Sequence, residues 1–513
     1  MTDAPASTGH GLDPCQSLKG PALLFAGLAL ALANFMVVLD TTIANVSVPN
    51  IAGGLAVSPD QGTWVITSYS VAEAITVPLT GWLARRFGPV KVFSLAMVSF
   101  AFWSAACGLA PSLGFLVVCR VMQGLSGGPM IPLSQTLLLR VFPPERQAAA
   151  IGLWAMTTVV APIAGPILGG TLCDNWGWPW IFYINVAPAL LCAGYVWRSL
   201  QLCESKPVRI PVDRIGLALL IVWVGAMQVM LDQGKDLDWF GSPFIVTLAL
   251  IALIGFAAFV IWELTDANPI VDLRVFRHRG FTAGAVTIAI GYGAFFSSIV
   301  LIPLWLQTSL AYTATDAGYV MAWNGVLAVA FSPIVARLVT KFDPRALVSF
   351  GLAWMAGISI VRTGFTTSAD YWTLSIPNLL QGIAVPFFFV PLTGLALSAV
   401  EPSETASAAG LMSFMRTTAG AFATSIITTA WDNGGTRAKS QLVGRVNDVQ
   451  GFINNLGLGT AQGTGQVDQL VRTQATMIST DHMFLYSAFV LLFGAGLIWI
   501  SPKPKGRVAA AAH

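Results

Sequence analysis

Long apolar runs recur along this chain and constrain its fold more than any other feature. A helix needs about 20 mainly apolar residues to cross the hydrocarbon core of a bilayer. Fourteen runs meet this requirement, at approximately 22–44, 62–83, 92–110, 114–138, 148–170, 180–199, 215–231, 244–264, 282–306, 316–338, 346–364, 372–397, 405–430 and 483–501. The runs are continuous, whereas the strands of a transmembrane barrel alternate with a period of two residues. The sequence therefore predicts an all-α polytopic membrane protein with 14 transmembrane helices.

The composition excludes several other classes of protein. Of the 513 residues, 55% are apolar and only 10% are charged, compared with about a quarter charged in soluble proteins. These values exclude an ordinary cytosolic enzyme, a secreted disulfide scaffold and a disordered chain. The net charge of +3 is too small to indicate nucleic-acid binding. The six cysteines and four histidines lack the spacing of a disulfide framework or a metal site, so neither is predicted.

ATP hydrolysis by this chain is also excluded. A P-loop needs Gly-Lys-Ser/Thr, and the only Lys that precedes Ser or Thr, Lys439, follows Ala438. Transport would therefore draw its energy from an ion gradient or from a separate ATPase subunit. No cofactor is predicted.

The positive charges indicate the orientation in the membrane. Most of the 27 Lys and Arg residues fall on one set of connections, and such connections are cytoplasmic. Both termini are then cytoplasmic, including an N-terminal segment at 1–21. The long polar segment 432–480 between the last two spans is then extracytoplasmic.

A weak internal repeat at an offset of about 258 residues organises the spans. Gln123-Gly124 recurs as Gln381-Gly382, and Gly152-Leu153 recurs as Gly410-Leu411. The repeat predicts an N-terminal six-helix bundle at 22–199 and a C-terminal six-helix bundle at 282–501, with two inserted helices at 215–264. Two such parallel bundles are the plan of the major facilitator fold. Chance similarity between apolar helices is the alternative.

Four charged residues lie well inside the predicted spans, at least four residues from either end, where an ionised group is costly and usually functional. They are Asp40, Glu73, Arg120 and Arg416. A carboxylate near a guanidinium can bind and release a proton when the hydration of the surrounding cavity changes. These residues are therefore the proton-coupling candidates. Two alternatives remain: a fixed ion pair that joins two helices, and a Glu73 that simply faces water.

The fifth predicted span contains the most specific local signal. Pro162 and Pro166 remove backbone donors and favour a kink. Gly165, Gly169 and Gly170 allow a neighbouring helix to approach closely. A packing face alone explains the glycines but not the two prolines.

Aromatic residues are abundant, and a subset on cavity helices could bind apolar drugs. The candidates are Phe295, Phe296, Trp305, Phe387, Phe388 and Phe389. Most other aromatic side chains are expected to face lipid or to lie at the membrane interface.

The motifs resemble those of one transporter family. They are Leu39–Val46, Gly81–Gly88, Arg120 with Gln123-Gly124, Gly165-Pro166 with Gly169-Gly170, Trp180–Val186 and Asn268–Leu273. Together they resemble the fourteen-span drug:proton antiporters of the major facilitator superfamily, from about residue 22 to 500. The resemblance implies that Arg120 takes part in proton coupling and that the Gly-Pro segment belongs to antiport rather than uptake.

One motif departs from the family pattern. The cytoplasmic gate loop, formed by Gly81, Arg85, Arg86 and Gly88, has Arg85 where the family usually has an acidic residue. The usual carboxylate role is therefore not transferred to this position.

The resemblance also implies a location and partners. It indicates a bacterial inner membrane, an EmrA-type periplasmic adaptor of the membrane-fusion class and a TolC-type outer-membrane channel. Within 432–480, an apolar face at helical spacing could dock the adaptor or the membrane surface. It comprises Val467, Leu470, Val471, Ala475 and Ile478. The alternative is a flexible loop.

Three functions compete at this point. The first is proton-driven export of hydrophobic, often weakly acidic compounds. The second is a proton symporter that imports an organic acid, which shares the fold and buried charges but does not explain the Gly-Pro segment. The third is a membrane-embedded enzyme, for which the spans contain no His, Cys or Ser constellation with catalytic spacing. The sequence favours the first and predicts no enzymatic activity.

Overall fold

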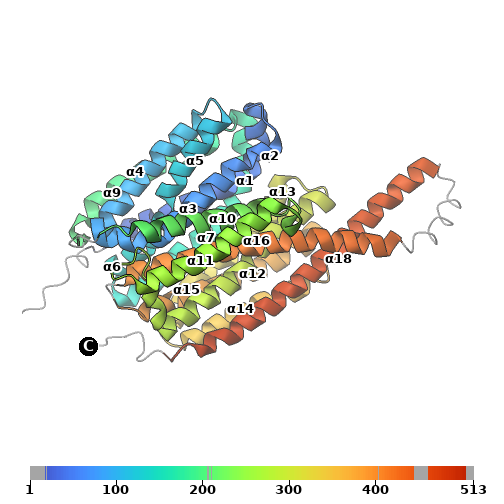
Figure 1. Ribbon diagram of the computed structural model, residues 1–513. Helices are drawn as coiled ribbons and strands as arrows, with labels where there is room; N and C mark the ends of the chain where they lie inside the picture. Colours follow the sequence, from blue (N-terminus) through green and yellow to red (C-terminus); the bar gives the residue numbers. More distant parts are fainter. Residues whose placement is uncertain are drawn as a thin grey trace, which may run out of the picture.

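The structure is a computed structural model that describes residues 18, 20–204, 207–208, 211–401, 404–443 and 460–503 (Figure 1). Regular secondary structure in these residues is entirely helical. The first half contains α1 (Pro21–Gly54), α2 (Pro59–Gly62), α3 (Trp64–Phe87), α4 (Pro89–Gly108), α5 (Leu113–Gly127), α6 (Met130–Val141), α7 (Pro144–Trp176), α8 (Trp180–Tyr183) and α9 (Val186–Leu200).

The remainder of the described chain forms eight longer helices. They are α10 (Arg214–Gln233), α11 (Pro243–Thr265), α12 (Arg279–Ser309), α13 (Ala314–Leu338), α14 (Pro344–Arg362), α15 (Tyr371–Ser398), α16 (Thr405–Val443) and α18 (Thr460–Leu497). Four short 3₁₀ helices, Gln201–Cys203, Trp239–Gly241, Leu273–Arg277 and Ile498–Ile500, lie in the connections and near the end of the described chain.

Local sequence explains many of the helix boundaries. Side chains of Ser112, Asp213, Thr313, Asp343 and Asp370 accept hydrogen bonds from the first backbone N–H groups of α5, α10, α13, α14 and α15. Such caps satisfy donors that have no partner inside a helix. Proline occupies the first turn of α1, α4, α7, α11 and α14, where its missing N–H costs nothing.

A helix occupies each of the fourteen predicted positions, but fewer than fourteen qualify as spans by length and composition. Within the described residues, eleven helical segments are long and apolar enough to cross a membrane, and the bent α7 makes a twelfth. The two that fall short are α3 and α16. Both carry polar residues along one side, and that side faces a cavity described below. The count of 14 therefore stays a prediction.

The helices of the two halves pack mainly with their own neighbours. In the first half α1 packs on α7 and α3 on α5, and in the second half α13 packs on α15 and α12 on α16. The main contacts between the halves are those of α7 with α13 and of α3 with α16, and α7 also packs against α15 and α6 against α16. A large core of buried apolar side chains extends through both halves.

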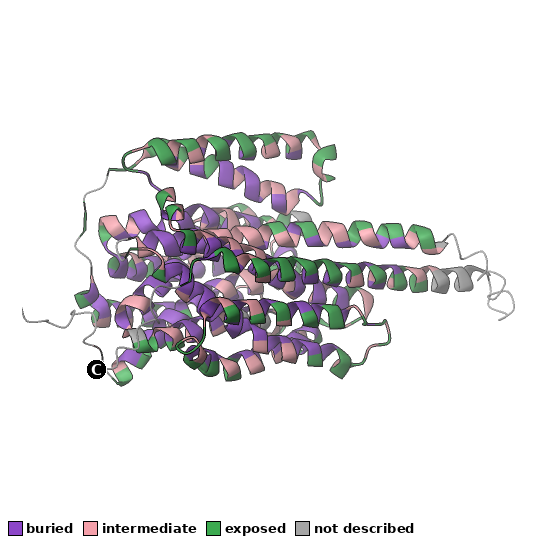
Figure 2. Cartoon of the chain, turned by 90° about the horizontal axis from the view of Figure 1, so that it is seen from below, coloured by how far each residue is buried: buried purple, intermediate pink, exposed green. Residues whose placement is uncertain are grey.

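The inserted helices α10 and α11 form a layer on one side of the molecule (Figure 2). The inner helix, α10, packs against α3 and α16, one from each half. The outer helix, α11, packs mainly on α10, and most of its large apolar side chains are exposed. An exposed helix this apolar fits contact with lipid.

The last two helices extend beyond the rest of the bundle (Figures 1 and 2). They contain 39 and 38 residues, so α16 is about 58 Å long, nearly twice the hydrocarbon thickness. Trp431 Nε1 donates to Thr480 Oγ1, and Lys439 forms an ion pair with Asp468 at 2.9 Å. Residues 432–443 and 460–480 are thus helical continuations of the predicted spans. The predicted helix ends near 430 and 483 are wrong, because apolarity ends at the membrane surface while the backbone hydrogen bonds continue.

One cysteine corrects the prediction of no disulfide. Cys203 is disulfide-bonded, whereas Cys107, Cys119, Cys173 and Cys192 are free. Cys203 follows α9 in a connecting segment, and sequence spacing does not reveal which connections the fold brings together.

Candidate functional site

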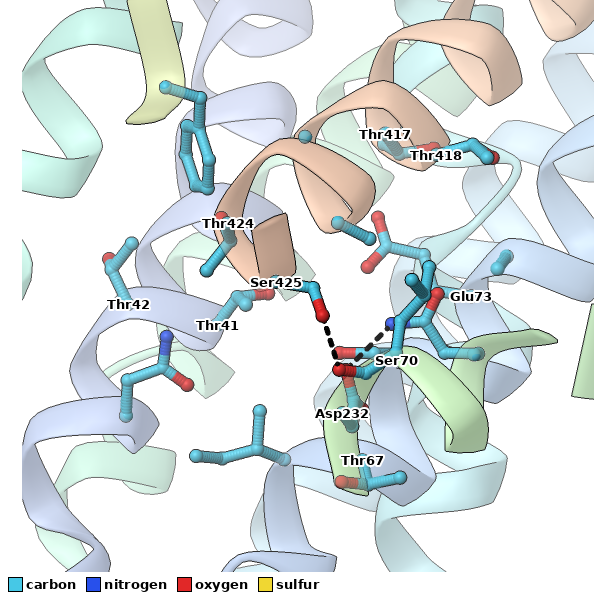
Figure 3. A pocket seen from close by; sticks show the side chains of 18 of the residues that line it. Thr41, Thr42, Thr67, Ser70, Glu73, Asp232, Thr417, Thr418, Thr424 and Ser425 are labelled. Atoms are coloured by element: carbon cyan, nitrogen blue, oxygen red, sulfur yellow. Dashed lines mark hydrogen bonds between the residues drawn. The ribbon is translucent and has the colours of Figure 1, made fainter. Parts of the chain in front are cut away.

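A cavity of about 410 Å³ lies between the two halves and the inserted layer (Figure 3). Its walls come mainly from α1, α3, α10, α12 and α16. Ten of the lining residues are serines or threonines: Thr41, Thr42, Thr63, Thr67, Ser70, Thr417, Thr418, Thr424, Ser425 and Thr428. The volume is within the range of sites for drug-sized ligands, and the hydroxyls provide donors and acceptors.

Two of the four predicted charges face this cavity from opposite halves. Glu73 on α3 and Arg416 on α16 both line it, and their charges interact electrostatically. Within the described chain neither side chain has an ion-pair partner within 4.0 Å. A carboxylate and a guanidinium that interact across an open cavity can respond to a proton or a ligand between them.

Aromatic rings hold Arg416 in place. Its guanidinium carbon lies 5.2 Å from the Trp154 ring centroid and 5.5 Å from that of Tyr292. The Trp154 indole N–H donates to Ser134 Oγ at 2.8 Å. Tyr292 stacks on Phe296 with ring centroids 5.4 Å apart. Cation–π contacts of this kind stabilise a buried guanidinium.

The other two predicted charges form an ion pair away from the cavity. Arg120 Nη1 and Asp40 Oδ2 lie 2.5 Å apart, and both side chains are fully buried. Gln123 Nε2 and Asn185 Nδ2 donate to Asp40 Oδ1 at 3.0 and 2.9 Å. Arg120 Nε donates to the Val65 carbonyl at 3.0 Å. The pair is therefore embedded in a polar network, which is the fixed-pair arrangement considered as an alternative above.

This ion pair lies directly behind the helix that carries Glu73. The Arg120 guanidinium carbon is 4.1 Å from the ring centroid of Tyr69, one turn before Glu73 on α3. A Cβ added at Gly124 would lie 3.1 Å from the Glu73 backbone nitrogen. Helix α5 therefore packs tightly against the turn of α3 that presents Glu73 to the cavity.

The Gly-Pro segment of α7 bends and packs closely on α1. The helix changes direction by 45° between Pro162 and Ala164. A Cβ added at Gly165 would lie 2.7 Å from the Thr42 Cβ, and one at Gly169 would lie 3.1 Å from Ile43 Cγ1. Gly170 has more space beside it, because the nearest atom to a Cβ added there is Thr315 Oγ1 on α13, at 3.7 Å.

A further carboxylate in the cavity was missed by the sequence analysis. Asp232, at the end of α10, lines the wall near Thr67 and Ser70 (Figure 3). Its Oδ1 accepts a hydrogen bond from Gln228 Nε2 at 3.1 Å. The predicted span ended at 231, so this carboxylate was not counted among the intramembrane charges.

Comparison with known proteins identifies the family. The family model described as Major Facilitator Superfamily matches residues 30–424. The chain belongs to the major facilitator superfamily. The predicted all-α major facilitator fold is thus confirmed, and the chain is a multi-pass membrane transporter rather than an enzyme.

Individual relatives refine the position within the superfamily. The chain is 44% identical over 497 residues to "Multidrug export protein EmrB" of Escherichia coli strain K12, covering 95% of this chain and 97% of EmrB. It is 41% identical over 494 residues to "Fatty acid resistance protein FarB" of Neisseria gonorrhoeae, covering 95% and 97%. The predicted resemblance is confirmed, and the chain is an EmrB-like member.

A solved structure shows the same fold at low sequence identity. The proton:xylose symporter XylE, bound to 6-bromo-6-deoxy-D-glucose, matches with a TM-score of 0.58 at 15% identity. The match covers 95% of this chain and 97% of XylE.

One end of the superfamily fold is closed between the halves. We call it the Gly88 end, after the residue at which α3 stops. A Cβ added at Gly81 would lie 2.7 Å from Ser407 Cα, and one at Gly410 would lie 3.1 Å from the Val77 carbonyl oxygen. The cavity instead reaches Thr63 and the exposed residues Lys235 and Asp236 at the other end. The transporter is therefore closed at the Gly88 end.

The predicted gate loop lies at this closed end, and another residue supplies its carboxylate. Glu204 accepts hydrogen bonds from the backbone N–H groups of Val90 and Lys91, at the start of α4. Gly88 has φ +92° and lies against the Glu204 carboxylate. Arg86 lies over the ring of Trp82, at 5.3 Å. The Arg85 carbonyl accepts from Val208 N–H at 3.0 Å.

Only one of the six predicted aromatic residues, Phe296, lines the described cavity. The others are buried in the apolar cores: Phe295, Trp305, Phe387, Phe388 and Phe389. For example, Phe389 packs against Phe295 and Phe388. The difference arises because neighbouring helices decide which face of a uniformly apolar helix meets the cavity.

Proposed function

We propose that this transporter exports hydrophobic toxic compounds across the bacterial inner membrane in exchange for protons. The observation that carries the proposal is the Glu73–Arg416 arrangement, in which opposite charges from the two halves face one drug-sized cavity. The relatives EmrB and FarB are named for multidrug export and fatty acid resistance, and these names support export and an apolar substrate class.

Glu73 is the proposed proton-binding group. When it is ionised, its attraction to Arg416 favours the approach of α3 and α16. A proton on Glu73 removes this attraction, and a substrate between the two side chains screens it. Proton and substrate therefore compete for the same charged site, and such competition is the requirement for exchange.

Asp40 and Arg120 are proposed to position this site. Their ion pair and the packing of α5 fix the turn of α3 that presents Glu73. We assign the main proton-binding role to Glu73 rather than to Asp40, both of which are among the four predicted coupling candidates. Arg416 keeps its proposed role in coupling.

The Gly-Pro segment is proposed to maintain a tight contact between α7 and α1 while the halves rock. Gly165 and Gly169 bring the two backbones close, so little space remains for a leak beside the cavity. The bend between Pro162 and Ala164 changes the direction of the helix near this contact.

The topology and assembly complete the proposal. Fourteen spans, cytoplasmic termini and a cytoplasmic Gly88 end would make the described state open toward the periplasm. The projecting α16–α18 pair would then reach a periplasmic adaptor of the EmrA type, which connects to a TolC-type outer-membrane channel. The length of α16 and α18 beyond the bilayer supports this role.

Proton release from inside-out vesicles tests the function. A lipophilic dye is added to acidified vesicles that contain wild type, Glu73→Gln or Asp40→Asn. We expect dye-triggered proton release in wild type and its loss in Glu73→Gln. Glu145→Gln, the same change at an exposed residue that does not line the cavity, serves as the matched control and retains release.

The alternatives give different results. Release that persists in Glu73→Gln and vanishes in Asp40→Asn returns the coupling role to Asp40. Absence of release with every drug, together with proton-driven uptake of an organic acid into right-side-out vesicles, identifies an importer and rejects the proposal.

A further inference from the structure

Asp232 is a cavity carboxylate without a positively charged partner. Its Oδ1 accepts a hydrogen bond from the Gln228 amide at 3.1 Å, and the Thr67 hydroxyl also interacts with the carboxylate. Its Oδ2 is buried with no partner within hydrogen-bond distance among the described residues. No Lys, Arg or His side chain of the described residues lies within ion-pair distance of it. Burying a carboxylate in this way is unfavourable unless a cation or a proton completes the site.

The other charges of the cavity do not compensate Asp232. Arg416 acts on Glu73 from across the cavity. Lys235 is exposed at the mouth, adjacent in sequence to the exposed Asp236. The cavity wall therefore has three carboxylates and two cations, and the half-buried Asp232 is the carboxylate left without a complement.

The surroundings of Asp232 suit an organic cation. Hydroxyl groups of Thr67 and Ser70 lie beside it (Figure 3). The stacked rings of Tyr292 and Phe296 line the same cavity, and aromatic faces attract cations that have shed their water. A bulky monovalent cation could place its charge near Asp232 and its apolar groups against these rings.

We propose that Asp232 makes this cavity selective for lipophilic organic cations, so that the inserted helix α10 supplies a substrate-recognition residue. The proposal rests on the export function proposed above and specifies one substrate class for it. It assigns a role in binding to a helix that belongs to neither repeated half.

Two probes of matched shape and opposite charge test the proposal. Tetraphenylphosphonium and tetraphenylborate are titrated into the purified full chain in nanodiscs, with empty nanodiscs subtracted. We expect Asp232→Asn to weaken tetraphenylphosphonium binding at least tenfold and to leave tetraphenylborate binding within twofold. Asp232→Glu, which keeps the charge, is expected to retain cation binding within about threefold.

A matched control separates recognition from general electrostatics. Asp238→Asn makes the same charge change six residues away, at an exposed residue that does not line the cavity. Its φ of 57° is one that asparagine tolerates. We expect binding of both probes to stay within twofold of wild type. An equal loss of cation binding in this variant overturns the proposal.

Further outcomes distinguish the proposal from the function on which it rests. Unchanged tetraphenylphosphonium affinity in Asp232→Asn, or equal weakening of both probes, overturns the cation site. Unchanged affinity with one fewer proton released per drug assigns Asp232 to proton binding instead. If wild-type vesicles show no drug–proton exchange, the export function fails, whatever the binding data show. If exchange is normal and the probe selectivity persists in Asp232→Asn, only this inference fails.

Discussion

Nitrogen donors surround the carboxylate of Asp40 on both oxygens. Arg120 and Gln123 approach from α5, and Asn185 approaches from the start of α9. These bonds join three parts of the first half at one buried point. A buried polar network of this kind favours one arrangement of its helices, and removing one partner leaves the others unsatisfied.

Replacing Asp40 by Asn is therefore expected to destabilise the protein. The change leaves the Arg120 guanidinium buried without a counter-ion, a situation that costs roughly 3–5 kcal/mol. Thermal unfolding of the purified protein measures the loss. The double variant Asp40→Asn/Arg120→Gln is expected to recover part of it, because no uncompensated charge remains. Equal stability of wild type and Asp40→Asn contradicts this interpretation.

Arg416 presents a different test, because its ring contacts depend on shape as well as charge. Lysine keeps the positive charge but lacks the planar guanidinium group that contacts the rings of Trp154 and Tyr292. We expect Arg416→Lys to retain about a tenth of the drug–proton exchange of wild type, and Arg416→Gln to retain none. Initial rates in vesicles, normalised to protein content, give the comparison. Identical rates for both variants show that the charge of Arg416 has no role.

At the scale of elements, the contact of α7 with α1 depends on which glycine faces the neighbour. Gly165 lies against the Thr42 side chain and backbone, and Gly170 has open space beside it. The two residues belong to one sequence motif but have different packing environments. The motif alone therefore does not say which glycine is required.

Gly165→Ala is expected to destabilise the protein by roughly 1–3 kcal/mol through overpacking. Gly170→Ala is the matched control, and we expect a change below about 0.5 kcal/mol, because its added Cβ makes only ordinary contact. Chemical unfolding monitored by tryptophan fluorescence compares the two variants. Equal effects show that helix propensity rather than the α7–α1 contact determines the result.

The sequence predicted the helix positions well, because a long apolar run in a membrane satisfies its backbone groups as a helix. It could not predict which helix face meets the cavity. Phe296 and Phe388 have similar sequence contexts, but only Phe296 lines the cavity. The role of Asn185 depends on its contact with Asp40, which lies 145 residues earlier in the sequence. Asp232 follows a predicted span end, where a carboxylate usually meets water.

At the scale of the whole molecule, α16 and α18 give the transporter a helical projection beyond its membrane-spanning body. Leu470 is 64% exposed on it, while Ala475 is buried. Of the predicted apolar face, the side chain of Val467 lies outside the described residues. The exposed part of the face is where an adaptor could dock.

Leu470→Asp is expected to lower drug resistance of cells that contain the adaptor by at least tenfold. Drug–proton exchange in vesicles is expected to stay within twofold of wild type, because the cavity is unchanged. Val208→Asp, the same kind of change at an exposed residue of the Gly88 end, serves as the control. If exchange falls as far as resistance does, the projection acts on transport itself and not on assembly.

The inserted helix α10 contacts α3 from the first half and α16 from the second. When these two helices move relative to each other, α10 cannot keep its position against both. Asp232 would therefore approach Glu73 in one part of the cycle and move away from it in another. A cation held between the two carboxylates would lose one of its partners at each turnover. In this view the added helix links the relative movement of the two halves to release of the cargo.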